Sequence, residues 1–518
     1  MVTPEKFQQH LKESAVSWGG SYVVMRKLIQ ERGLKVGAEI GLGYGGNAEN
    51  MLKNTNLEHL YGVDPFAHDD NANSVMNVSQ EDFDDIYNFV KQKLSPFADR
   101  FELVRKTSVE ASSDVPDNLD FVYIDGEHSY EGVFNDLCTW FKKVRMGGII
   151  SGHDYNHPNL PGIKKAVDEF LRRFGWEIHK EDNFVWWVEK KPLNISFFIP
   201  TYNYGKSIRE AVESIVKDNF SPGDELIIFN DGSTDHTAKY LEELKAEYPE
   251  IKILSHARNK GPSATRNDAV EACGNPIVFS HDHDNVLVPE SIAKLKEFFI
   301  NSGADVASFG ELHFFVGDKN NIKDKWIFKE GFFTLKDCLD GSSAFPGSSG
   351  NYMFTKESWL RAGGYPNSWF DSWGLGIRQL VTGSKMLAMP DTFYWHQYHH
   401  NHGYESTYIK GIRTGRISSL AALQILIPFL QLLDPKSVNY IMSKQGRNIW
   451  LEKLSKKPLR VRFNTLEEYG EFINNKEDHP SVLRRAFRKL RRTVKKIEPI
   501  RKHYIKLRRI FKSILWNT

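Results

Sequence analysis

Short apolar runs alternate with amphipathic, helix-like stretches along the first part of the chain. The runs VGAEIGL, HLYGVDPF, RFELVRK, LDFVYIDG and GGIISGHD have the length and composition of strands. This alternation predicts a parallel sheet with helices on both faces. The closing segment WEIHKEDNFVWWVEKK contains two alternating runs around a polar turn, which predict an antiparallel hairpin at one edge.

A second series of the same kind begins directly after residue 191. Its strand-like runs are ISFFIPTYN, ELIIFNDGS, IKILSHARN and NPIVFSHDHDN, and the helical stretches SIREAVESIV and TAKYLEELKAEY lie between them. Beyond residue 410 the strand signals fade, and SSLAALQILIPFLQLLD predicts a helix interrupted at Pro428. We therefore expect an α/β protein with two doubly wound domains, residues 1–190 and 191–410, followed by a helical basic region, residues 411–518.

Composition supports a multidomain globular protein. The chain has 518 residues, of which 40% are hydrophobic and 26% charged, so a disordered or fibrous protein is excluded. Its three cysteines are scattered without paired spacing, which argues against a disulfide framework and for a reducing compartment. The first residues lack the apolar core of a signal peptide, and no run reaches the roughly 20 apolar residues of a membrane span. We expect a cytoplasmic protein.

A glycine-rich turn marks the first candidate site. The segment AEIGLGYGG places Gly41, Gly43, Gly45 and Gly46 between a strand and a helix, where the backbone can closely approach a ligand. About twenty residues later, Asp64 ends the next strand, a position suited to holding ribose hydroxyls. Together these features favour an adenosine-type cofactor, with NAD and S-adenosylmethionine (SAM) both open at this point.

Acid and histidine clusters follow at the ends of two further strands. Asp125 and His128 follow one strand, and His153 and Asp154 follow the next. Because neighbouring parallel strands end at one crevice, these four side chains can face one point. Through the motifs IDGEHSYEGVFNDL and GGIISGHDY, most of residues 35–190 resembles the Rossmann-like SAM-dependent methyltransferases, in particular the metal-dependent sugar and small-molecule O-methyltransferases.

This resemblance implies methyl transfer from SAM to a hydroxyl group. His128 would be the general base, and a divalent ion would lower the pKa of the acceptor alcohol. A histidine is a less usual ligand for Mg²⁺ than a carboxylate, because hard cations prefer oxygen. The ion could therefore be Mn²⁺, or Asp125 and Asp154 could bind it while His153 has only an orienting role. The implied SAM-binding residues are Glu39, Gly41, Gly43, Gly45 and Asp64, and the implied metal ligands are Asp125, His153 and Asp154.

Four motifs in the second series resemble the family-2 glycosyltransferases of GT-A fold, over residues 193–404. They are PTYN, DGSTD, NKGPSATRN and the Asp-x-Asp of HDHDN. The resemblance implies a nucleotide-sugar donor, and a divalent Mg²⁺ or Mn²⁺ ion that stabilises the departing diphosphate. The implied residues are Thr201, Tyr202 and Asp231 for the base, Arg266 for phosphate or sugar, and Asp282, Asp284 and His396 for the metal.

Two departures from the family pattern concern the catalytic groups. Asn285 stands where a third acid is common, and Asp371-Ser372 stands where the family has Glu-Asp. We expect Asp371 to be the catalytic base, because an inverting displacement needs one carboxylate near the acceptor hydroxyl. The alternative is that the second domain is a non-catalytic module that binds a glycan or nucleotide.

The C-terminal tail carries most of the positive charge. Residues 481–518 contain 14 Lys or Arg and one acid, Glu498, within a formal net charge of only +2 for the whole chain. Basic and apolar residues interleave at helical spacing, which fits an anionic membrane surface. A helix covering the acidic remainder of the chain is an equal alternative, and no nucleic-acid partner is expected.

We expect a bifunctional transferase of glycan or surface-polysaccharide biosynthesis, cytoplasmic or peripheral at the inner face of a membrane. It would methylate a sugar hydroxyl and transfer a sugar to a glycan or lipid-linked acceptor. The paired acids and histidines argue against a non-catalytic scaffold, and an NAD oxidoreductase lacks an evident set of hydride-transfer residues. The oligomeric state is left open.

Overall fold

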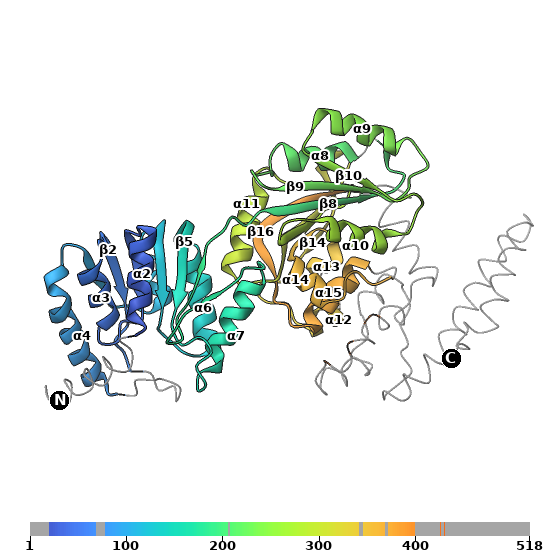
Figure 1. Ribbon diagram of the computed structural model, residues 1–518. Coiled ribbons are helices and arrows are strands. Elements are labelled where there is room, and N and C mark those ends of the chain that lie inside the picture. Colours follow the sequence, from blue (N-terminus) through green and yellow to red (C-terminus); the bar gives the residue numbers. More distant parts are fainter. Residues whose placement is uncertain are drawn as a thin grey trace, which may run out of the picture. The chain divides into compact units, whose positions relative to one another are not determined.

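The structure, a computed structural model, describes residues 20–68, 78–205, 208–340, 345–367 and 371–398, together with residues 425, 429 and 432. All of these belong to one compact unit. Figure 1 shows two sheets in succession, the first in blue to teal and the second in green to orange. The prediction of two α/β folds is confirmed, and most of the expected basic helical region lies outside the described residues. None of the described helices has the length and apolar character that crossing a bilayer requires.

The first sheet has seven strands in the order β3-β2-β1-β4-β5-β7-β6. Strands β1 to β5 are parallel, and β6 and β7 form the expected antiparallel hairpin at one edge. The strand order reverses between β1 and β4, the place where open α/β sheets bind ligands. The strands are β1 (Val36–Ile40), β2 (His59–Val63), β3 (Phe101–Val104), β4 (Leu119–Ile124), β5 (Val144–Gly152), β6 (His179–Lys180) and β7 (Trp186–Glu189).

Three helices of this part, α4, α5 and α6, begin at Ser or Thr residues that cap them. Ser79 forms a capping box with Asp82, and Ser129 accepts a hydrogen bond from the Gly132 N–H. The helices are α2 (Tyr22–Arg32), α3 (Gly46–Asn54), α4 (Gln80–Leu94), α5 (Ser108–Ala111), α6 (Tyr130–Phe141) and α7 (Pro161–Arg172).

The second sheet has nine strands in the order β10-β9-β8-β11-β15-β13-β16-β12, with β14 paired to β13. Strands β8 to β11 are the expected parallel set, whereas β15 runs antiparallel to both β11 and β13. The strands are β8 (Ile195–Thr201), β9 (Glu225–Asn230), β10 (Ile251–Ser255), β11 (Ile277–Ser280), β12 (Asn285–Val286), β13 (Val306–Val316), β14 (Asp318–Ile327), β15 (Tyr352–Thr355) and β16 (Met386–Gln397).

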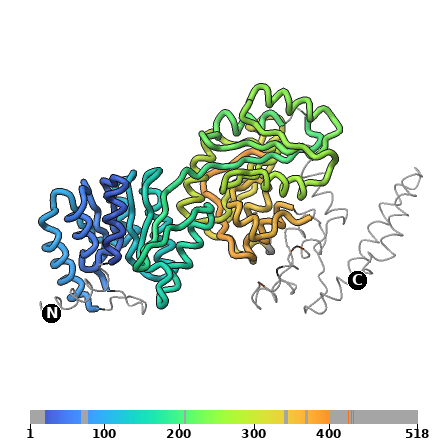
Figure 2. Tube along the Cα trace, viewed as in Figure 1, coloured from blue at the N-terminus to red at the C-terminus, as the bar shows by residue number. Residues whose placement is uncertain are grey.

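Helices cover this sheet as they do the first. They are α8 (Ile208–Val216), α9 (Thr237–Glu247), α10 (Pro262–Ala272), α11 (Ser291–Asn301), α12 (Leu335–Asp340), α13 (Pro346–Ser349), α14 (Lys356–Arg361) and α15 (Asp371–Val381). The chain passes from one sheet to the other within residues 190–194, where the tube changes from teal to green (Figure 2).

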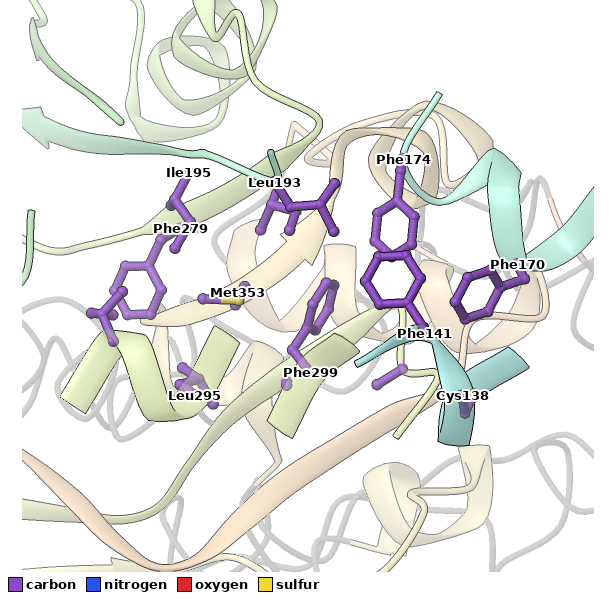
Figure 3. Close-up of a cluster of buried hydrophobic side chains, with 14 of the residues drawn as sticks. Cys138, Phe141, Phe170, Phe174, Leu193, Ile195, Phe279, Leu295, Phe299 and Met353 are labelled. Carbon is purple, nitrogen blue, oxygen red and sulfur yellow. The ribbon is translucent and has the colours of Figure 1, made fainter. Parts of the chain in front are cut away.

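One buried hydrophobic cluster extends through both parts of the chain, the first with the seven-stranded sheet (up to residue 190) and the second with the nine-stranded sheet (from residue 191). Phe141, Phe170 and Phe174 come from α6, α7 and the turn after α7, and Leu193 and Phe299 come from the second part (Figure 3). Because burial of apolar surface is the main favourable contribution to folding, this continuity holds the two sheets together.

Candidate active sites

A cavity of about 1260 Å³ lies at the carboxyl ends of β1, β2 and β4. Gly41 has a φ of 86°, and a Cβ there would lie 2.1 Å from the Asp125 carbonyl oxygen, so β1 and β4 approach each other closely only with glycine. Gly45 is not among the described residues that line the cavity. It precedes α3, and a Cβ there would contact Val90 and Leu94. The predicted residues that line the cavity are Glu39, Gly41, Gly43, Asp64, Asp125, His128, His153 and Asp154.

Two buried carboxyls support the glycine turn. Asp64 accepts hydrogen bonds from the N–H groups of Leu42, Gly43 and Phe66, at 3.0, 3.2 and 2.8 Å. Glu39 Oε1 accepts a hydrogen bond from Asn47, whereas its Oε2 is buried without a protein partner. Burial raises the pKa of both carboxyls, that of Glu39 to about 8.

The four acid and histidine residues predicted to converge do so. His128 Nε2 lies 3.6 Å from Asp125 Oδ1 and 3.1 Å from Asp154 Oδ2. His153 Nδ1 lies 3.8 Å from Asp125 Oδ1 and 3.2 Å from Asp154 Oδ1. Burial lowers the pKa of His128, but hydrogen bonds and the charges of the two aspartates outweigh it and raise that pKa to about 9.

The chemistry of this cluster fits a divalent cation. One ligand atom from each of Asp125, His128 and Asp154 lies within 4.8 Å of the other two, a separation that one ion can bridge. Sequence reasoning placed His153 in the metal set and His128 as the base, whereas this geometric set contains His128. The two histidines lie close enough to the same aspartates for either to take either role.

In the second sheet, the predicted base-binding residues lie at adjacent strand ends. Thr201 is buried and Tyr202 is 42% exposed. Asp231 is buried, and its carboxylate accepts hydrogen bonds from the N–H groups of Lys260 and Gly261. His256, which sequence reasoning did not single out, lies with Nδ1 2.7 Å from Asp231 Oδ1. The sequence feature that could have identified His256 is its position directly after β10, at the same edge of the sheet as Asp231.

Arg266 connects two other predicted residues. Its Nε donates to Asp371 Oδ2 at 3.0 Å, and its Nη2 donates to Asp282 Oδ1 at 2.5 Å. All three side chains are at least three-quarters buried. Burial raises the pKa of Asp282, and the positive charge of Arg266 opposes that shift. Arg266 was expected to contact phosphate or sugar, and here it pairs the candidate base with a candidate metal ligand.

Asp284 and His396 lie beside each other in the second site. His396 Nδ1 lies 3.8 Å from Asp284 Oδ1 and 2.7 Å from Asn285 Oδ1. Among the described residues, Asp282, Asp284 and His396 do not form a three-ligand set as tight as the one in the first cavity. The second site therefore does not show a preformed three-ligand cation site of that kind in the described part of the chain.

Comparison with known proteins gives one family match in each of the two parts of the chain. Residues 35–155 match the family described as "Methyltransferase domain", and residues 196–359 match "Glycosyl transferase family 2". The chain is similar to the uncharacterized glycosyltransferase YibD of Escherichia coli (strain K12), with 32% identity over 183 residues, 35% of this chain and 47% of that protein. It is also similar to the poly(ribitol-phosphate) beta-glucosyltransferase of Bacillus spizizenii, with 29% identity over 140 residues, 27% of this chain and 22% of that protein.

A solved structure, S. aureus TarS 1–349 in complex with UDP-GlcNAc, aligns at 19% identity with a TM-score of 0.40. The alignment covers 54% of this chain and 79% of that one. The chain spans about half, or less, of the length of the two curated relatives.

Each matched segment lies in one of the two α/β sheets and carries one of the two candidate sites at its strand ends. The chain is a fusion of a methyltransferase domain and a family 2 glycosyltransferase domain.

Proposed function

We propose that the protein is a bifunctional transferase of glycan assembly, which methylates a sugar hydroxyl with SAM and transfers a sugar from a nucleotide donor. The observation that carries the first activity is the convergence of Asp125, His128, His153 and Asp154 on a cavity that also contains the glycine turn. The second activity is supported by the family match over residues 196–359.

The residues of the first site would have separate roles in methyl transfer. A divalent cation, when bound by Asp125 and Asp154 with one histidine, would make the acceptor hydroxyl more acidic. The other histidine would take the proton of that hydroxyl. The turn at Gly41 and Gly43 leaves room for the cofactor, so that the methyl group and the acceptor oxygen can be held in line.

In the second site, Asp371 would accept the proton of the acceptor hydroxyl, and Asp282 and Asp284 would hold a cation at the diphosphate. Arg266 lies between the base and the metal ligand, so both groups are placed by one buried guanidinium. That arrangement orders the two carboxylates before donor and acceptor bind.

A second candidate function follows from the same contact. Asp371 is already paired with Arg266, and the next residue is Ser372, whose buried Oγ has no protein partner. If Arg266 does not release Asp371, the second domain binds a nucleotide or glycan without transferring sugar, and it would present the acceptor to the methyltransferase.

Thermal-shift measurements on the full chain test both pockets at once. Ligands that bind the folded state raise the melting temperature. We expect shifts with S-adenosylhomocysteine, and with one of UDP, GDP or dTDP when Mn²⁺ or Mg²⁺ is present. No shift with S-adenosylhomocysteine would contradict the first activity. Nucleotide binding without transfer from the matching nucleotide sugar to any glycan acceptor would favour the binding module.

We also propose that the basic tail attaches the enzyme to anionic membranes, where a lipid-linked acceptor would be located. The support is the charge of residues 481–518. We expect the full chain to pellet with anionic liposomes in low salt and to remain in solution after deletion of those residues. Equal pelleting of both proteins would contradict the proposal.

A further inference from the structure

Lys385 lies in the second part of the chain, and its ammonium contacts two helices of the first. It directly precedes β16, and its Nζ donates to the Tyr130 hydroxyl at 3.0 Å and lies 3.5 Å from Glu169 Oε1. The same ammonium lies 3.3 Å from the centroid of the Phe134 ring. Since Tyr130 and Phe134 belong to α6 and Glu169 to α7, one cation holds both helices.

Tyr130 is directly connected to the first site. It is the first residue of α6, two positions after His128, and Ser129 between them caps the helix. On the other side, a Cβ added to Gly162 would lie 2.7 Å from the Tyr130 nitrogen and 3.4 Å from the His128 carbonyl oxygen. The backbone of His128 is therefore packed against the start of α7, while its neighbour Tyr130 is held by Lys385.

We propose that Lys385 is a positioning residue for the first site: by holding Tyr130 and Glu169, it fixes the backbone of His128 relative to Asp125 and Asp154. The inference rests on the proposed function of that site. It makes the glycosyltransferase domain a structural support of the methyltransferase site. His128 is the histidine of the tight three-ligand set, and the proposal takes it as the ligand. Loss of the contact should therefore weaken cation binding and leave the glycine turn unchanged.

A second ion pair between the two parts of the chain serves as a matched control. Arg172 Nε lies 3.1 Å from Glu357 Oε1, which joins α7 to α14. Arg172 is half exposed and belongs to α7, away from the first turn of α6 that carries Tyr130. Substitution of Arg172 removes a charge pair between the two parts without removing the Lys385–Tyr130 hydrogen bond.

The test uses the full-length variants Lys385→Met, Lys385→Arg, Tyr130→Phe and Arg172→Met. It also uses Asp125→Asn and the double variant that combines Lys385→Met with Tyr130→Phe. Mn²⁺ affinity is measured by titration, and the first site is assigned as the binding that Asp125→Asn abolishes. S-adenosylhomocysteine affinity is measured by calorimetry, and folding by circular dichroism. Lys385→Met and Tyr130→Phe should each weaken Mn²⁺ binding at this site about tenfold, the effect typical of lost ligand support. The double variant should lose no more Mn²⁺ affinity than Lys385→Met alone, because the Lys385–Tyr130 hydrogen bond is already absent in Lys385→Met.

The other readouts separate positioning from general loosening. S-adenosylhomocysteine affinity should not change, Lys385→Arg should retain Mn²⁺ binding, and Arg172→Met should match the wild type. Wild-type Mn²⁺ affinity in Lys385→Met and Tyr130→Phe would overturn the positioning role, and so would an equal loss in Arg172→Met. If Lys385→Met does not fold, Tyr130→Phe decides. A wild-type chain that binds neither S-adenosylhomocysteine nor Mn²⁺ would instead overturn the proposed function.

Discussion

Glu39 shows how one buried carboxyl makes the first domain sensitive to pH. Burial raises its pKa to about 8, against an ordinary value of 4.5, so between these values the folded chain holds a proton that the unfolded chain has lost. Stability therefore falls as pH rises through this window. Glu39→Gln removes the ionisation and keeps an oxygen for Asn47. We expect the variant to be more stable than the wild type at pH 8.5, by up to about 4 kcal/mol for a shift of this size.

At pH 4.5 the stability difference should be small, because Glu39 is protonated in the folded chain there and half protonated in the unfolded chain. Urea unfolding of the ligand-free chain at the two pH values measures the effect. A variant that is less stable than the wild type at pH 8.5 would show that the fold favours the ionised carboxylate.

His128 and His153 both lie within 4 Å of Asp125 and Asp154, so either could be the metal ligand or the base. Separate substitutions would assign the two roles. Replacing the histidine that acts as base with alanine should lower kcat by about 10²-fold or more and leave the Mn²⁺ affinity unchanged. Replacing the histidine that acts as ligand should weaken Mn²⁺ binding first. Metal titration and methyl-transfer kinetics on His128→Ala and His153→Ala distinguish the two. Equal effects of both variants on both quantities would contradict this division of roles.

At the scale of the elements, the turn after β1 depends on Gly41. An alanine there meets the Asp125 carbonyl and also adopts a φ of 86°, whereas Gly43 has a φ of 52° and open space around its Cβ position. We expect Gly41→Ala to lower the stability of the first domain by about 3 kcal/mol or more, and Gly43→Ala by about 1 kcal/mol. Denaturant unfolding of the ligand-free variants measures both. Equal losses would show that backbone strain alone matters at Gly41.

Some elements of the fold could be predicted from the sequence, and others could not. The strands β1 to β5 and β8 to β11 follow from short apolar runs between helical segments, and the site at Asp125 and Asp154 follows from the rule that parallel strands end at one edge. Strand β13 was not foreseen, because it is buried on both faces and shows no alternation, and β14 consists largely of charged and amide residues. The Arg266–Asp371 pair joins residues 105 positions apart, which no local pattern indicates.

At the scale of the whole molecule, the shared core should make the two domains unfold together. The hydrophobic cluster is continuous across both sheets. Arg173, after α7, donates to the carbonyls of Phe299 in α11 and of Ala304 just after it. Calorimetry of the full chain should therefore show one main transition. S-adenosylhomocysteine should raise the temperature of that whole transition, although its proposed site lies in the first domain only.

Gly303 allows this coupling to be tested. It has a φ of 69°, and a Cβ there would lie 2.4 Å from the Phe134 ring and 2.9 Å from Cys138 Sγ, both on α6. Gly303→Ala should open the contact and split the transition in two, with S-adenosylhomocysteine raising only one of them. Gly383→Ala is the matched control, because Gly383 has a φ of 87° with no atom near its Cβ position, so it adds backbone strain without a steric clash. Two independent transitions already in the wild type would contradict the coupling.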